Sequence, residues 1–152
     1  MDITLLEKRI LEVEALAPVL KAFIRELGVE KVREIVTEIN MEASRQYGRE
    51  LAHRLDSAAI AELANEIKNW SAGDSLEEEM LEQTENTFFF NVTRCRFAEA
   101  YEQLGIKDLG AALSCCRDFG FIEGFNPKIK LIRTQTIMEG APICDFCYYL
   151  EE

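Results

Sequence analysis

The stretch NTFFFNVT, residues 86–93, is where the chain changes from helical to strand-like patterning. Three consecutive phenylalanines, a valine and two threonines favour extended backbone, because aromatic and β-branched side chains pack well on a pleated sheet. Helical periodicity precedes this stretch, and short helical and strand-like segments follow it. The pattern predicts an α+β protein in which a helical N-terminal half packs with a small antiparallel sheet of three or more strands and two further helices.

The helical half, residues 1–70, is expected to contain three helices. Apolar side chains recur at helical spacing over residues 5–27 with charged residues between them, and Gly28 is suited to end that helix. A second helix is expected over residues 29–55. Ser57 is suited to cap the third helix, which ends near the close of this half.

An acidic connector, residues 71–86, follows the helices. Six acidic side chains and no basic ones lie between Ser71 and Phe90. Like charges at this density are normally solvated, and their spacing does not match a calcium-binding loop. The run therefore predicts an exposed linker or a turn of exposed helix.

The C-terminal half, residues 87–152, is expected to contain the sheet and two helices, over residues 98–104 and 107–122. Residues 128–138 and 143–150 are strand-like. The short connection between them is rich in turn formers and predicts an antiparallel hairpin. With 152 residues and no internal repeat, the chain is expected to fold as a single domain, residues 1–152.

The charge balance restricts the partners. Seventeen basic and twenty-eight acidic residues give a formal charge of -11. Such a chain repels phosphate backbones and anionic lipids, so no nucleic-acid or membrane partner is expected. The chain lacks an apolar run of about 18 residues and a basic N-terminal leader, which predicts a cytoplasmic protein. The remaining partners are a small-molecule substrate or ligand and a second copy that forms a homodimer.

All five cysteines lie in the last third of the chain: Cys95, Cys115, Cys116, Cys144 and Cys147. An odd count without an export leader predicts free thiols in a reducing compartment. The cluster is the first indication of chemistry, because thiols act as nucleophiles and as metal ligands.

Cys95 lies where a strand gives way to a helix, between Arg94 and Arg96. A helix N-terminus and neighbouring cations both lower the pKa of a thiol, so a reactive thiolate is one prediction. The alternative is a small buried apolar side chain, which is common for cysteine.

Cys115 and Asp118 are three residues apart on a predicted helix, which places both side chains on one face, and Glu123 lies near the end of that helix. A thiol beside a carboxylate can ligate a metal, act as a nucleophile with its base, or pack as an inert pair. Cys116 shares an apolar stripe and is expected to pack in the core. The single histidine, His53, lies on a charged helix and is expected at the surface, so acid/base chemistry is left to the carboxylates.

The last strand alternates between two faces. Cys144, Phe146 and Tyr148 fall on the face expected to meet the core, within reach of Cys115, while Cys147 falls on the other. No spacing matches a strong zinc motif, so no metal or cofactor is predicted, although thiol ligation of a metal stays open.

Arg133 alternates with apolar residues along a predicted strand, and a buried arginine needs an acid or an anionic ligand. Two partners are considered for it, a salt bridge with Glu123 and the carboxylate of a substrate. Thr134 and Thr136 are further candidates for hydrogen bonds to a ligand.

Two stretches, NVTRCRFAEAYEQLG (residues 91–105) and CCRDFGFIEGFNPKIKLIRTQTIMEGAPICDFCYYL (residues 115–150), together resemble the family of L-2-amino-thiazoline-4-carboxylic acid hydrolases. The resemblance covers roughly residues 88–150. Its marks are Asn91, Cys95, Cys115, Asp118, Asn126, Pro127, Arg133, Thr134, Gly140, Cys144, Asp145 and Phe146.

The resemblance implies hydrolysis of a cyclic isothiourea carboxylate to N-carbamoyl-L-cysteine. That reaction needs a base or thiolate, an acid for the departing sulfur and a cation for the carboxylate. The chemistry assigns catalytic roles to Cys95 or Cys115 and to Asp118 with Glu123. Substrate binding is assigned to the remaining candidates, which are Arg133, Asn91, Thr134 and Cys144.

Two alternatives belong to other functional classes. The segment EGAPICDF, residues 139–146, also resembles small-molecule-binding domains related to four-vinyl reductases, which implies a non-catalytic ligand- or metal-sensing module. The other alternative is an interaction protein that dimerises through its helical half. Convergence of the thiols and carboxylates on one cavity would favour the enzyme or the sensor.

Overall fold

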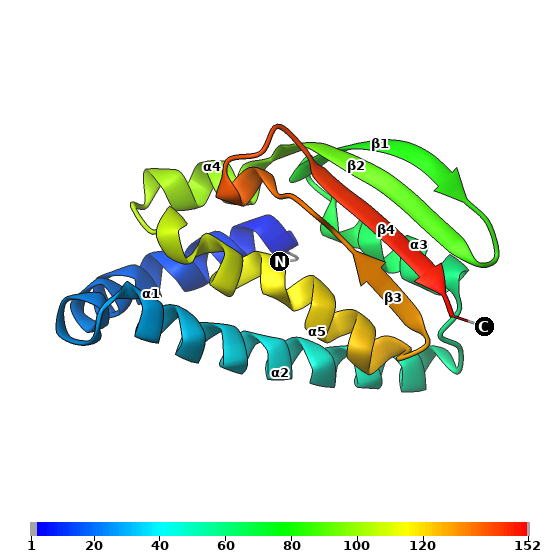
Figure 1. Ribbon diagram of the computed structural model, residues 1–152, viewed down its shortest axis with the longest axis horizontal. Coiled ribbons are helices and arrows are strands. Elements are labelled where there is room, and N and C mark those ends of the chain that lie inside the picture. The colour runs from blue at the N-terminus through cyan, green and yellow to red at the C-terminus, as the bar shows by residue number, and fades with distance from the viewer. Residues whose placement is uncertain (1–2, 152) are drawn as a thin grey trace.

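The computed structural model describes residues 3–151 (Figure 1). The helices are α1 (Leu5–Leu27), α2 (Val29–Leu55), α3 (Ile60–Trp70), α4 (Arg96–Gln103) and α5 (Cys116–Phe125), and the strands are β1 (Leu76–Gln83), β2 (Thr87–Cys95), β3 (Ile129–Ile132) and β4 (Cys144–Leu150). The sheet is antiparallel throughout, in the order β1-β2-β4-β3. The predicted α+β class, with a helical N-terminal half, is confirmed. Within residues 3–151, no helix is long and apolar enough to cross a bilayer.

The first two helices have the predicted bounds. Thr4 and Glu7 form a reciprocal capping box at the start of α1. Gly28 ends α1 with a bond from its N–H to the Ile24 carbonyl (2.9 Å), and its φ of +84° lets α2 begin at the next residue. The predicted Ser57 cap is wrong: α3 starts at Ile60 after an extended Ala59, because the chain needs the intervening residues to turn from α2.

The prediction of an exposed linker or helical turn over residues 71–86 is wrong in part, because residues 76–83 form β1. This strand pairs with β2 along the edge of the sheet, and Glu77, Glu78, Glu79 and Glu82 are all exposed. Backbone hydrogen bonds hold the strand while its side chains remain in water. Charged side chains on an edge strand also discourage pairing with another sheet.

The hairpin prediction is confirmed in pairing and wrong in its connection. β3 and β4 are antiparallel neighbours, with Ile129 opposite Leu150. However, β3 ends at Ile132, and the connection over residues 133–143 includes a 3-10 turn, Ile137–Glu139. The carboxylate of Asp145 accepts hydrogen bonds from this segment and draws it away from the ladder.

The long helix expected over residues 107–122 is divided. A 3-10 turn (Lys107–Leu109) and a π-helical turn (Ala111–Cys115) precede α5, which continues to Phe125. A π-helical turn widens a helix locally and is frequent at functional sites. Here it places Ser114 and Cys115 at the start of α5.

Figure 1 shows α2 and α5 side by side on one side of the sheet, and these two helices make the most extensive contact between elements. Three glycines allow it: Gly120 and Gly124 on α5, and Gly48 on α2. A Cβ atom at Gly120 would lie 2.5 Å from the Met41 carbonyl, and one at Gly48 would lie 2.7 Å from the Phe125 nitrogen. Both distances are shorter than van der Waals contact, so the helix separation depends on glycine at these positions.

The core consists of two apolar clusters. The first packs α3 and α5 on the inner face of the sheet and includes Ile60, Leu63, Ile67, Phe88, Phe90, Val92, Phe121, Phe125, Phe146 and Tyr148. The second joins α1, α2 and α4 to the turns before α5 and to the 3-10 turn after β3, and it includes Val13, Leu20, Val32, Phe97, Tyr101, Leu109 and Met138. Burial of Cys144, Phe146 and Tyr148 confirms the predicted inner face of β4.

Candidate functional site

A cavity of about 790 Å³ lies between the helices and the inner face of the sheet. Side chains of α1, α2, α3 and α5 line it, together with residues of β2 and β4. Its walls are mainly apolar, with a few charged groups among them. This volume is in the range of pockets that hold small organic molecules.

Five of the predicted site residues line this one cavity. They are Cys95 at the end of β2, Cys115 and Asp118 at the start of α5, Arg133 after β3, and Cys144 on β4. The residues come from segments far apart in the sequence. The structure therefore brings together the thiols and the carboxylate on which the enzyme and sensor hypotheses depend.

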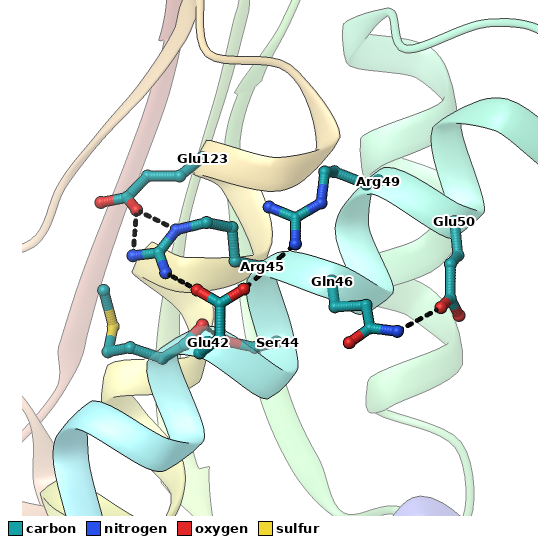
Figure 2. Close-up of polar contacts among 8 residues, drawn as sticks. Glu42, Ser44, Arg45, Gln46, Arg49, Glu50 and Glu123 are labelled. Atoms are coloured by element: carbon teal, nitrogen blue, oxygen red, sulfur yellow. Dashed lines mark hydrogen bonds and ion pairs between the residues drawn. The ribbon is translucent and has the colours of Figure 1, made fainter.

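Glu123 lies outside the cavity. Its carboxylate accepts hydrogen bonds from Nε (3.0 Å) and Nη2 (2.8 Å) of Arg45, whose guanidinium also contacts Glu42 (Figure 2). The side chain of Glu123 is 51% exposed. The expected bridge between Arg133 and Glu123 is therefore wrong. Glu123 lies five positions after Asp118, which turns the two side chains to different faces of α5.

Asn91 and Thr134 also lie outside the cavity. Asn91 is on the outer face of β2, because Phe90 and Val92 on either side of it point into the core. Thr134 is exposed, and its hydroxyl donates to Asp145 at 2.5 Å. Neither side chain is placed to touch a ligand in the cavity.

Asp145 fixes the segment that follows β3. Its carboxylate accepts hydrogen bonds from the backbone N–H groups of Thr134 and Gln135, each at 2.9 Å. Burial raises the pKa of Asp145, but these bonds and the Thr134 hydroxyl outweigh it, so the pKa lies below its ordinary value. Because Arg133 directly precedes this anchored segment, Asp145 also helps to position Arg133.

Asp145→Asn is expected to lower the free energy of unfolding at neutral pH by about 1–2 kcal/mol. A depressed pKa contributes stability above the unfolded pKa of about 4, and this contribution is lost as pH falls through the folded value. Urea unfolding at neutral and acidic pH measures the difference, which should shrink in acid. Asp108→Asn, at an exposed aspartate outside the cavity, is the control. A difference that stays the same in acid would contradict the ionic contribution.

Asp118 and Arg133 form a buried ion pair in the cavity, in which the side chains are 19% and 5% exposed. Arg133 also donates to the Cys115 carbonyl at 2.9 Å. Its guanidinium lies over the rings of Phe119 (5.0 Å) and Phe146 (4.9 Å). The guanidinium of Arg133 is thus largely engaged within the protein.

Burial determines the ionisation of this pair. Loss of solvation raises the pKa of Asp118, and the charge of Arg133 opposes that increase. For Arg133, burial lowers the pKa and Asp118 raises it, with a net increase. The arginine therefore stays charged and holds the carboxylate of Asp118 in the cavity.

The thiols in the cavity are not activated. Burial raises the pKa of Cys95 to about 11, although backbone N–H groups of Ala98 and Phe97 oppose the shift. The expected lowering is wrong because burial outweighs these donors, and Arg94 pairs with Glu99 instead of the thiol. Burial also raises the pKa values of Cys115 and Cys144. All three thiols are therefore protonated at neutral pH.

Cys95 is expected to react slowly with iodoacetamide near neutral pH. A pKa of about 11 instead of 9.0 reduces the thiolate fraction roughly 100-fold, and the greater nucleophilicity of a more basic thiolate leaves a net slowing of roughly tenfold. Mass spectrometry of the alkylated peptide measures the rate, and the same protein in urea is the control. Equal rates in the folded and unfolded protein would contradict the raised pKa of Cys95.

The other predicted positions lie away from the cavity. Cys116 is partly buried and donates its S–H to the Ala112 carbonyl at 3.1 Å, and Cys147 lies on the face of β4 opposite Cys144. His53 is exposed, as predicted. Within residues 3–151, no three His, Cys, Asp or Glu side chains are grouped to hold a metal ion.

Several lining residues were not among the predicted site. Ser114 and Arg117 line the cavity beside Cys115 and Asp118, and both pairs have the same spacing of three. That shared spacing was visible in the sequence. Arg9 of α1 also lines the cavity, and nothing in the sequence links it to a site more than a hundred residues away.

The fold is similar to that of the phenol-responsive sensory domain of the transcription activator PoxR, solved with phenol. The TM-score is 0.60 at 12% identity, over 91% of this chain and 74% of that chain. None of the proteins with curated functions matches the sequence. The sequence profile of the L-2-amino-thiazoline-4-carboxylic acid hydrolases matches residues 8–148, which includes the helical half as well as the motifs of the C-terminal half. The chain therefore belongs to the L-2-amino-thiazoline-4-carboxylic acid hydrolase family.

Proposed function

We propose that this protein hydrolyses a small cyclic isothiourea that carries a carboxylate, the class of substrate for which its family is named. The observation that supports it most is the carboxylate of Asp118, held by Arg133 in a cavity of suitable volume. A carboxylate whose pKa is raised by burial is suited to exchange protons with a substrate near neutral pH.

The reaction balances with Asp118 as the proton carrier. Water adds to the ring carbon between nitrogen and sulfur while Asp118 accepts one of its protons. The bond from that carbon to sulfur then breaks, and Asp118 returns the proton to the departing sulfur. The second water proton passes to the ring nitrogen, and the oxygen remains as a urea carbonyl.

In this proposal the thiols do not act as the nucleophile that the sequence suggested. With raised pKa values, Cys95, Cys115 and Cys144 are poor attacking groups in the free protein. We assign them to the wall of the cavity, where they present weak S–H donors and a polarisable surface to a sulfur-containing ring.

A turnover assay tests the proposal. The protein is incubated with L-2-amino-thiazoline-4-carboxylate, and N-carbamoyl-L-cysteine is quantified by liquid chromatography with mass spectrometry. Product that accumulates in proportion to protein concentration and time supports hydrolysis. Product no faster than in buffer alone contradicts it.

A second candidate is a ligand-binding sensor without turnover. The fold is similar to that of a phenol-responsive sensory domain, and the cavity of this chain has mainly apolar walls and protonated thiols. Titration calorimetry with phenol and with the thiazoline distinguishes the two functions. Saturable binding without product would favour the sensor over the hydrolase.

A further inference from the structure

Arg117 differs from the other arginines of the cavity. Arg9 pairs with Glu12 and Arg133 pairs with Asp118, whereas Arg117 forms no ion pair within residues 3–151. It is partly buried, and burial lowers the pKa of its guanidinium. An arginine charge that is desolvated without a carboxylate costs stability, so this arrangement points to binding rather than to folding.

Neutral acceptors hold Arg117 in place. Its Nε donates to the Leu113 carbonyl at 2.9 Å, and its Nη2 donates to the side-chain oxygen of Asn40. Asn40 is buried and donates to the Ala112 carbonyl at 2.9 Å, which fixes its orientation. A guanidinium has five N–H donors, so three have no partner within residues 3–151.

The surroundings of Arg117 favour an anion. Glu12, the acid on the α1 side of the cavity, already pairs with Arg9 (2.5 Å) and lies 4.0 Å from Lys8. Among residues 3–151, four basic and three acidic side chains line the cavity, a net charge of +1 in a chain of net charge -11. A locally positive cavity in an acidic protein attracts an anionic ligand.

We propose that Arg117 binds the carboxylate of the ligand, while the ring lies toward Asp118 and the thiols. A guanidinium with free N–H donors matches the two oxygens of a carboxylate in a planar, bidentate arrangement. Ser114, three residues before Arg117 and also in the cavity, supplies a further hydroxyl donor. This assignment rests on the proposed small-molecule function and moves carboxylate recognition from Arg133 to Arg117.

Two probes that differ by the carboxylate test the proposal: L-2-amino-thiazoline-4-carboxylate and 2-amino-2-thiazoline, which lacks it. Titration calorimetry gives Kd for each with the wild type, Arg117→Gln and Arg117→Lys. Arg117→Gln should weaken binding of the acid by about 10- to 100-fold and leave binding of 2-amino-2-thiazoline unchanged. Arg117→Lys should lie between, since it keeps the charge and loses the planar fork.

The control is Arg25→Gln, which removes one exposed positive charge outside the cavity and should leave both affinities unchanged. Equal weakening of both probes by Arg117→Gln, no weakening of either, or no binding of the acid by the wild type would overturn the proposal. Should Arg117→Gln not fold, Arg117→Lys decides by the same comparison. Binding of the acid that depends on Arg117 but occurs without turnover contradicts the hydrolase and not this assignment. Turnover that Arg117→Gln leaves unchanged contradicts this assignment and not the hydrolase.

Discussion

Asp118→Asn is expected to reduce kcat/KM for the thiazoline carboxylate by about 10²- to 10⁴-fold, the usual contribution of a general base. Asparagine keeps the shape of the side chain and cannot accept the proton from water. Steady-state kinetics with chromatographic detection of the product measure the effect.

Controls separate catalysis from folding. Asp118→Asn leaves Arg133 buried without its carboxylate, which is expected to cost about 3–5 kcal/mol, so thermal unfolding must confirm that the variant is folded at the assay temperature. Asp118→Glu keeps the ion pair and displaces the carboxylate, and it should also lose activity. Glu123→Gln, at the surface carboxylate on the same helix, should stay within about twofold of the wild type. Full activity in folded Asp118→Asn would remove Asp118 from the mechanism.

The pH profile gives an independent readout of Asp118. The base must be ionised, and burial raises its pKa above the ordinary value of 3.8. Activity is therefore expected to rise with pH through a pKa above that of a free carboxyl group. Because Arg133 opposes the shift, loss of the arginine should move the profile to still higher pH.

Gly124→Ala is expected to lower the free energy of unfolding by about 3 kcal/mol or more. An added Cβ would collide with the backbone of Arg45, where it would lie 2.8 Å from the carbonyl carbon and 3.0 Å from Cα. Backbone cannot move aside as a flexible side chain can, so α2 and α5 must separate and open the core between them. Thermal unfolding should show a Tm lower by roughly 6–12 °C.

The expected destabilisation by Gly124→Ala is opposite in sign to the effect of helix propensity. Alanine is the better helix former by about 1 kcal/mol, so an unhindered Gly124→Ala would stabilise the protein. Glu123→Ala, at the adjacent exposed position, loses only the surface pair with Arg45 and should cost less than about 1 kcal/mol. A raised Tm for Gly124→Ala would show that the two helices are not held as closely as the structure indicates.

Local pattern predicted most of the secondary structure and failed where tertiary contacts decide. The bounds of α1 and α2 followed from apolar periodicity and Gly28. The strand β1 was missed because glutamates dominate it, and only its pairing with β2 makes it a strand. The π-helical turn before α5 was missed because a single apolar stripe over residues 107–122 is also compatible with a regular helix.

The candidate site was predicted in part. Cys95, Cys115, Asp118 and Cys144 line one cavity, as expected for an enzyme or a sensor, whereas Glu123, which was expected to join them, lies outside it. The environment of the thiols was not predicted correctly. Flanking arginines suggested a lowered pKa for Cys95, but burial dominates and raises it to about 11. Sequence neighbours do not reveal how much water a thiol retains.

The sequence by itself determined the α+β class, the helical first half and the concentration of all five thiols in the last third, because periodicity and residue chemistry are local properties. The tertiary structure alone decided which of these groups meet. It paired Arg133 with Asp118, turned Glu123 toward Arg45 and left Arg117 without an acid within residues 3–151. The physical reason is that pairing and desolvation depend on distance in space, which packing of remote segments sets.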